Sequence, residues 1–229
     1  MKNVIITGAA GALGKATVEY FLEKGYSVFG TIHKDNDNAK LPSHKSLTTQ
    51  VLDLNNTTDV NSFIKEVTGK IQVDAALLLA GGYAGGNLSN TNIDDIKRQI
   101  AMNFDTAYNV ARPLWNYFLE KKAGRLVFVG SQLPLQLEKS IQAVAYTLSK
   151  SLLFTLAEIM NKESKGLNVV ASIVAPSTID TASNRQYMPQ ADYNKWVKTE
   201  ELAELFEFLI SDKASALREP VIKAFKNVI

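Results

Sequence analysis

Short apolar runs and amphipathic stretches alternate along the chain. The first run, residues 2–7, ends in a glycine-rich turn, as a strand buried on both faces does. Residues 12–24 carry apolar side chains at helical spacing until Gly25 ends the helix. The same alternation then predicts strands at 27–32, 47–54, 74–80, 125–130, 167–175 and 220–225, and helices at 56–68, 92–121, 141–164 and 198–211.

This alternation, with no linker between halves, is typical of one α/β domain. We expect a single domain over residues 1–229, built on a doubly wound parallel β-sheet of about seven strands flanked by helices. The longest helix, 92–121, is expected to bury one continuous face made of Ile93, Ile96, Ile100, Phe104 or Met102, Tyr108, Ala111, Leu114 and Phe118.

Residues 176–197, after the sixth strand, show no hydrophobic period. An irregular segment of about twenty residues is uncommon in a compact domain and is usually functional. Ligands of parallel sheets bind outside the carboxyl ends of the strands, where this segment starts. We therefore expect residues 176–197 to form a substrate loop or lid.

The composition excludes several kinds of chemistry. The chain has 229 residues, no cysteine, and only two histidines, His33 and His44. A thiol nucleophile, a disulfide and a cysteine zinc site are impossible, and no metal site is expected. A Ser-His-Asp hydrolase is disfavoured because both histidines precede the third strand. The net charge of +2 without a basic stripe, and apolar runs too short to span a bilayer, predict a cytoplasmic protein without nucleic-acid or membrane partners.

A glycine-rich turn joins the first strand to the first helix. Gly8 permits a sharp turn, Gly11 lets backbone approach a pyrophosphate, and Gly14 lets the helix pack close to the sheet. The helix N-terminus offers N–H groups and the positive end of its dipole to the phosphates. We therefore expect a dinucleotide bound at Thr7, Gly8, Gly11, Ala12, Leu13 and Gly14.

The end of the second strand selects the cofactor, because it lies near the adenosine ribose. An acidic residue there favours NAD, and a basic one tolerates a 2′-phosphate. Thr31 and Ile32 end this strand and His33 and Lys34 follow, so we expect NADP, with NADPH preferred over NADH. A solvated loop is the alternative for His33 and Lys34. Asp53, after the third strand, is a candidate acceptor for the adenine amino group, or else a helix cap.

Tyr146 and Lys150 lie four residues apart and share one face of a helix. A tyrosine pKa of about 10 is too high for acid–base work at neutral pH, and a neighbouring cation lowers it. Tyr146 follows the fifth strand, whose carboxyl end carries Ser131. The same spacing occurs in two pairs that we interpret as helix-surface pairs, Tyr20 with Lys24 and Tyr117 with Lys121.

The glycine-rich turn, Ser131 and the pair of Tyr146 with Lys150 follow one another in the order found in a known enzyme family. The chain resembles the short-chain dehydrogenases/reductases over essentially its whole length, through Thr7-Gly8 to Gly14, Asp53-Leu54, Ala80-Gly81, Asn103, Ser131, Tyr146 to Lys150, and Ala175-Pro176 to Thr181. The resemblance implies a Rossmann-type fold and hydride transfer from NADPH to a carbonyl or imine. It adds cofactor contacts at Leu54, Ala80, Gly81, Gly82, Pro176 and Thr181.

The resemblance also assigns roles to four side chains. Tyr146 would be the general acid–base, and Lys150 would hold the nicotinamide ribose and lower the tyrosine pKa. Ser131 would bond the substrate oxygen, and Asn103 would anchor a proton-relay water. Ser131 precedes Tyr146 by fifteen residues, more than is typical, so Ser140 is the alternative.

Other departures concern the cofactor half. Gly11 stands one position early in the turn, and Ser177 replaces the glycine usual after Pro176. Residues 78–81 read Leu-Leu-Ala-Gly where the family has Asn-Asn-Ala-Gly. The resemblance therefore implies that a structural hydrogen bond near the adenine is lost.

Two segments resemble the quinonoid dihydropteridine reductase branch of this family, residues 73–87 and 180–196. A flat pterin would suit the rings of Tyr83 and Trp196 and the amide of Asn184, although loop packing is the alternative for the two rings. That branch carries an acidic residue after the second strand and lacks the serine and asparagine. Because this chain has Lys34, Ser131 and Asn103, we expect a general carbonyl-reducing enzyme, and the pterin substrate is a hypothesis that rests on the two segments.

A catalytically silent NADP-binding sensor of the same fold is the alternative from another functional class. Loss of the tyrosine–lysine pair would mark it, and Tyr146 and Lys150 are both present. The resemblance further implies a homodimer or homotetramer paired through helices 92–121 and 141–164.

Overall fold

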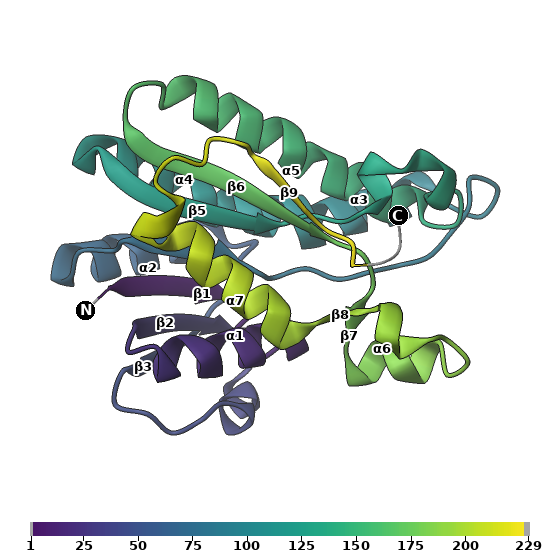
Figure 1. Ribbon diagram of the computed structural model, residues 1–229, viewed down its shortest axis with the longest axis horizontal. Coiled ribbons are helices and arrows are strands. Elements are labelled where there is room, and N and C mark those ends of the chain that lie inside the picture. The colour runs from purple at the N-terminus through teal and green to yellow at the C-terminus, as the bar shows by residue number, and fades with distance from the viewer. Residues whose placement is uncertain (1, 227–229) are drawn as a thin grey trace.

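The computed structural model describes residues 2–226 of the chain. Within that range seven parallel strands form one sheet, in the order β3-β2-β1-β4-β5-β6-β9 (Figure 1). The order reverses between β1 and β4, so the sheet is doubly wound as predicted. The strands are β1 Asn3–Thr7, β2 Ser27–Ile32, β3 Leu47–Val51, β4 Ala75–Leu78, β5 Ala123–Val129, β6 Asn168–Pro176 and β9 Val221–Ala224.

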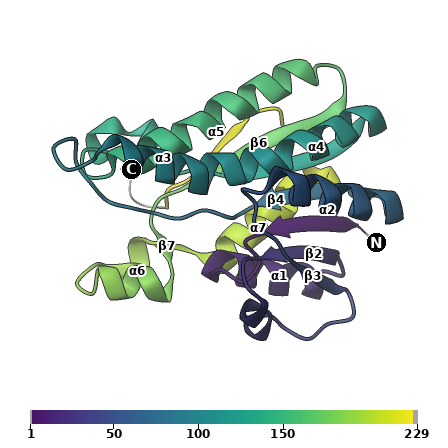
Figure 2. The ribbon, with the colours of Figure 1, turned by 180° about the vertical axis from the view of Figure 1, so that it is seen from behind.

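Helices cover both faces of the sheet, as Figures 1 and 2 show. Helices α1 (Ala12–Glu23) and α7 (Thr199–Ile210) lie on one face. Helices α2 (Thr57–Lys70), α4 (Thr106–Lys121) and α5 (Val144–Glu163) lie on the other. No helix within residues 2–226 is both long and apolar enough to cross a bilayer.

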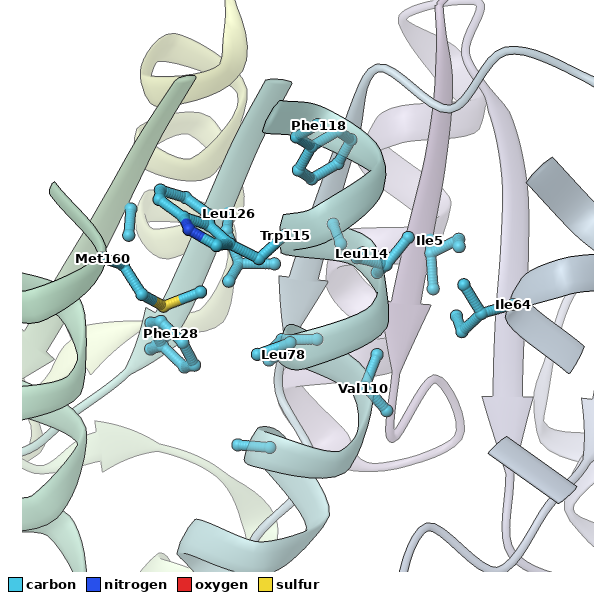
Figure 3. Packing of buried hydrophobic residues seen from close by; sticks show 14 of the residues in the cluster. Ile5, Ile64, Leu78, Val110, Leu114, Trp115, Phe118, Leu126, Phe128 and Met160 are labelled. Carbon is cyan, nitrogen blue, oxygen red and sulfur yellow. The ribbon is translucent and has the colours of Figure 1, made fainter. Parts of the chain in front are cut away.

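Each strand contributes side chains to two cores, because successive residues point to opposite faces. Val4 and Ile6 of β1 pack into the core under α1 and α7, whereas Ile5 packs into the core under α2 and α4. In the second core, Leu114 and Phe118 of α4 are fully buried (Figure 3). Both faces of the sheet are therefore fixed by dry packing, which holds the carboxyl ends of the strands in place.

The predicted helix 92–121 is divided by a π-turn, Ala101–Asp105, between α3 (Ile93–Ile100) and α4. The wider turn changes which side of the helix is buried. Ile93 is 61% exposed, whereas Gln99 is 4% exposed and Asn103 is fully buried. The expectation of one continuous apolar face is therefore wrong before the π-turn. After it, the expectation holds for Ala111, Leu114 and Phe118, which are buried, but not for Tyr108, which is 39% exposed.

The segment after β6 has secondary structure of its own, so the prediction of an irregular stretch is wrong. Strand β7 (Ile179–Asp180) pairs with β8 (Val197–Lys198), and the short helix α6 (Ala182–Tyr187) lies between them. Thr181 caps α6 by accepting a hydrogen bond from the Asn184 N–H at 3.2 Å. This unit projects beyond the carboxyl ends of the strands, on the right of Figure 1.

Candidate active site

Four predicted side chains meet at the carboxyl ends of β4 and β5. Tyr146 and Lys150 come from α5, Ser131 follows β5, and Asn103 lies in the π-turn. Ser131 forms a side-chain hydrogen bond with Tyr146. The Lys150 Nζ lies 5.9 Å from the centroid of the Tyr146 ring. The Asn103 Nδ2 donates a hydrogen bond to the Oγ of Ser149 at 3.1 Å, which links Asn103 to the helix α5 that carries Tyr146 and Lys150.

The Tyr146 hydroxyl lies in a poorly solvated environment. Burial raises the pKa of Tyr146, and the nearby Tyr83 raises it further, while the hydrogen bond with Ser131 lowers it. Burial is the largest of these causes, so the pKa lies above its ordinary value. The sequence led us to expect a pKa lowered by Lys150. That expectation is wrong, since the net shift is upward and the contact that lowers the pKa is the hydrogen bond with Ser131.

Lys150 is a buried cation. Its side chain is 5% exposed, and its Nζ donates a hydrogen bond to the Val129 carbonyl at 2.8 Å. Burial lowers the pKa of Lys150 to about 8, so the ammonium form still predominates at neutral pH.

The surface tyrosine–lysine pairs have similar geometry. Their ammonium groups lie 5.1 and 5.7 Å from the tyrosine ring centroids. Both of these lysines are exposed, whereas Lys150 is buried. Burial at the strand ends, and not the four-residue spacing, distinguishes Tyr146 with Lys150 from Tyr20 with Lys24 and Tyr117 with Lys121.

Asn103 is bonded to both backbone groups of Gly82. Its Oδ1 accepts from the Gly82 N–H, and its Nδ2 donates to the Gly82 carbonyl, both at 3.0 Å. Its Nδ2 also reaches Gln99 Oε1 at 3.2 Å as well as Ser149. The sequence reasoning missed Ser149 and Gln99. Their positions gave a signal, since Ser149 directly precedes Lys150 and Gln99 lies four residues before Asn103 on the same helical face.

Ser131 and Ser140 differ sharply in their contacts. The residues between them form two 3₁₀ turns, Leu133–Leu135 and Leu137–Lys139, which absorb the extra chain length before Tyr146. Ser140 Oγ donates to the Leu133 carbonyl at 2.7 Å and so closes these turns. Ser131 is therefore the serine that contacts Tyr146, and Ser140 is engaged in loop structure.

The glycine-rich segment after β4 forms one wall of the site. Gly86 pairs with the start of α5, donating to the Gln142 carbonyl at 2.8 Å and accepting from the Val144 N–H at 2.9 Å. This pairing brings Tyr83 against Tyr146, with ring centroids 5.0 Å apart in an edge-to-face arrangement. Tyr83 is 60% exposed, so much of its ring remains open to solvent.

The other candidate substrate residues have partners within the segment after β6. Asn184 Nδ2 donates to the Ile179 carbonyl at 2.8 Å. Trp196 is 6% exposed, and its ring packs on Tyr193 with centroids 4.8 Å apart. These contacts agree with loop packing, the alternative left open for Trp196. Pro176, at the base of the segment, accepts a hydrogen bond from the Gln132 N–H at 2.9 Å.

The turn between β1 and α1 fits a dinucleotide. Gly8 has φ +65°, and a side chain there would meet the Ala80 backbone at 3.0 Å. A side chain on Gly14 would overlap the Gly8 carbonyl. Gly11 precedes α1 without a capping side chain, so the helix N-terminus offers N–H groups to a ligand, as expected for Ala12 and Leu13. Thr7 Oγ1 accepts from the Ala80 N–H at 3.2 Å and links the turn to the segment after β4.

The residues predicted to lie near the adenosine are mostly polar, and His33, Lys34 and Asp53 among them are exposed. Thr31 is buried, its carbonyl accepting from the Ala9 N–H at 3.0 Å, and His33 and Lys34 beyond it are exposed. Asp53 Oδ1 accepts from the Asn55 N–H at 2.9 Å, which is a turn contact and leaves its second oxygen for another donor. The adjacent Leu54 is buried.

Comparison with known proteins agrees with this arrangement. The family model for the short chain dehydrogenases matches residues 2–192, most of the chain. The chain belongs to the short-chain dehydrogenases. Membership makes it an oxidoreductase that uses a nicotinamide cofactor and a small-molecule substrate.

Several members of the family are similar to the chain over nearly its full length. A dihydropteridine reductase of Dictyostelium discoideum is 27% identical, covering 97% of this chain and 94% of its own. A 3-oxoacyl-(acyl-carrier-protein) reductase of Thermotoga maritima is 28% identical, with coverages of 96% and 95%. The solved structure of ElxO with NADP bound superposes with a TM-score of 0.89 at 20% identity, covering 97% of this chain and 96% of ElxO, which supports the fold.

Replacing Ser131 tests the electrostatic description of Tyr146. Ser131→Ala removes the hydrogen bond that lowers the pKa of Tyr146, so we expect that pKa to rise further. Ser140→Ala is the matched control and should leave it unchanged, because Ser140 bonds the Leu133 carbonyl. A phenolate absorbance titration, with the Tyr146→Phe variant subtracted, measures the shift. Equal effects of the two variants would contradict the assignment of Ser131.

Proposed function

We propose that the chain is an NADPH-dependent reductase of a carbonyl or imine group, with Tyr146 as the proton donor. The observation that carries the proposal is the Tyr146 hydroxyl, bonded to Ser131 and set beside the buried Lys150 ammonium at the carboxyl edge of the sheet. A bound nicotinamide supplies the hydride, and the protein supplies the proton.

The raised pKa of Tyr146 supports reduction as the working direction. At neutral pH the phenol keeps its proton and can donate it to a substrate oxygen or nitrogen as negative charge develops there. Ser131 can donate to the same substrate atom and help to hold it in line with the phenol. Lys150, charged below a pKa of about 8, then stabilises the phenolate left on Tyr146.

The residues proposed to hold the cofactor follow the carboxyl edge. Backbone groups of the first turn take the pyrophosphate, Lys150 takes the nicotinamide ribose, and Asn103 supports the wall formed by Gly81 and Gly82. Both hydrogens of the Asn103 amide have acceptors, so a relay water near it would bond to the second lone pair of Oδ1 or to the backbone. The remaining proposed contacts are Thr7, Gly8, Gly11, Ala12, Leu13, Gly14, Thr31, His33, Lys34, Asp53, Leu54, Ala80, Pro176 and Thr181.

Quinonoid dihydropterin is the substrate that we propose first. The similarity to a dihydropteridine reductase supports it, as does the exposed ring of Tyr83, which abuts Tyr146 and could stack on a flat bicycle. The similarity to 3-oxoacyl-(acyl-carrier-protein) reductases, together with Ser131 and Asn103, supports a ketone as the second candidate. Asn184 and Trp196 would contribute only if the segment 176–197 rearranged as a lid, since both are engaged within it.

A panel of acceptors tests this order. We expect the pure protein to oxidise NADPH with quinonoid dihydropterin at a higher kcat/KM than with simple ketones, aldehydes or quinones, measured by loss of NADPH absorbance. Because quinonoid dihydropterin also oxidises NADPH without enzyme, the blank rate must be subtracted. Turnover of ketones but not of the pterin would overturn the pterin proposal. No turnover of any acceptor would favour a silent NADP-binding sensor.

The Tyr146→Phe variant tests the proton donor. It keeps the ring that packs against Tyr83 and removes only the hydroxyl. We expect kcat to fall by about a hundredfold or more on the best acceptor, because the general acid is lost. NADPH affinity, followed by fluorescence titration, should change little. Unchanged turnover would remove Tyr146 from its proposed role.

The Lys34→Glu variant tests the cofactor preference. Lys34 is exposed at the end of β2, where a 2′-phosphate would lie, so its reversal should raise the Kd of NADPH roughly fivefold to tenfold and that of NADH much less. Lys40→Glu is the matched control, because Lys40 lies in the same loop and pairs with Asp37 at 2.6 Å. Equal weakening of NADPH and NADH by Lys34→Glu would contradict the preference.

We further propose that the protein forms a homodimer or homotetramer through the surface of α4 and α5. Leu148, Leu152 and Ile159 of α5 are 47%, 39% and 59% exposed, and Tyr108 of α4 is 39% exposed. Exposed apolar side chains at helical spacing are typical of helices that pair between subunits. Light scattering of the purified protein measures the assembly. The cytoplasmic location expected from the sequence stays a prediction.

A further inference from the structure

We propose that Gln99 is a positioning residue, which orients the Asn103 carboxamide and thereby holds the backbone beside Lys150. The inference rests on the proposed function for its effect on turnover, but its structural part does not. Gln99 lies in the last turn of α3, one helical turn before Asn103. It is 4% exposed, although no ligand-binding or catalytic role accounts for a buried amide there.

The hydrogen bonds of Asn103 show what Gln99 supplies. The Asn103 Nδ2 has two hydrogens and three acceptors within reach: the Gly82 carbonyl at 3.0 Å, Ser149 Oγ at 3.1 Å and Gln99 Oε1 at 3.2 Å. These two hydrogens serve three acceptors, of which Ser149 lies on α5 and Gln99 on the helix that leads to Asn103. Gln99 therefore holds the amide from its own helix while Ser149 holds it from α5.

The amide of Gln99 gains little for itself from this position. Among the described residues, the acceptor that its Nε2 reaches is Met102 Sδ at 4.0 Å, and thioether sulfur is a weak acceptor. Burying a polar group with poor partners is unfavourable, and an apolar side chain would fill the same space without that cost. The contact of Gln99 that has an evident use is the one from its Oε1 to Asn103.

The orientation of Asn103 matters because its side chain packs closely against the backbone of Gly81. A Cβ on Gly81 would lie 2.6 Å from Asn103 Oδ1 and 3.4 Å from Lys150 Nζ. Displacement of the Asn103 amide would therefore disturb Gly82, through its two hydrogen bonds, and the adjoining Gly81, which lies beside the Lys150 ammonium. Ser149 extends the link to the catalytic helix, since its Oγ donates to the Tyr146 carbonyl at 2.7 Å.

The Gln99→Leu variant tests the proposal. Leucine keeps the volume and removes the acceptor, so we expect faster hydrogen exchange at the Gly82 amide and a roughly tenfold lower kcat, with the Kd of NADPH changed less than twofold. Gln99→Glu keeps an acceptor oxygen and should restore most of kcat. Gln72→Leu is the matched control, because Gln72 is exposed just before β4, at the amino ends of the strands and away from the site.

A double-mutant cycle separates positioning from general destabilisation. In an Asn103→Ala background, Gln99→Leu should no longer lower kcat, because the residue through which it acts is gone. An equal fall in both backgrounds, or unchanged exchange at Gly82, overturns the proposal. If the wild-type protein reduces no acceptor while Gln99→Leu still speeds Gly82 exchange, the proposed function fails and the positioning role stands.

Discussion

The carboxamide of Asn103 pairs with both backbone groups of Gly82, and this contact joins the two halves of the site. The half proposed to hold the cofactor ends in the glycine-rich segment after β4, and the half proposed to be catalytic begins on α5. Asn103 reaches the first directly and the second through Ser149. A regular α-helix would turn residue 103 by a different angle, so the π-turn at 101–105 is part of the same constraint. The π-turn that interrupts the helix therefore also sets the position of the Asn103 amide.

Near this contact, burial shifts the pKa values of Tyr146 and Lys150 in opposite directions. It raises the pKa of Tyr146 and lowers the pKa of Lys150 to about 8, so desolvation favours the neutral form of both. A protonated phenol suits proton donation, but an uncharged lysine would not stabilise the phenolate. The value near 8 keeps the cation at neutral pH. Desolvation therefore leaves Tyr146 as an acid while still permitting a charged neighbour.

The sequence predicted the features that depend on local pattern. The strand at 27–32 matches β2 at both ends, and Gly8, Gly11 and Gly14 lie where the turn needs them. It could not predict features that depend on contacts between distant segments. The resemblance assigned Ser131, but the two 3₁₀ turns that accommodate the extra residues between Ser131 and Tyr146 were not predicted. The sequence did not predict the π-turn, because the apolar residues on either side of it keep the spacing of one continuous helix. The burial of Gln99 and Asn103 shows that the buried face of the helix changes there.

Backbone groups predominate at one end of the proposed site, and side chains predominate at the other. The end proposed for the dinucleotide is formed by glycines, helix N–H groups and strand ends. The end proposed for the substrate is formed by side chains on connecting segments, such as Tyr83 after β4. Relatives at 27 or 28% identity therefore share the reaction class while their names cover substrates as different as a pterin and an acyl thioester. We therefore expect substrate choice to depend on the rings and amides near Tyr146, because the other residues of the site are the ones proposed to hold the cofactor.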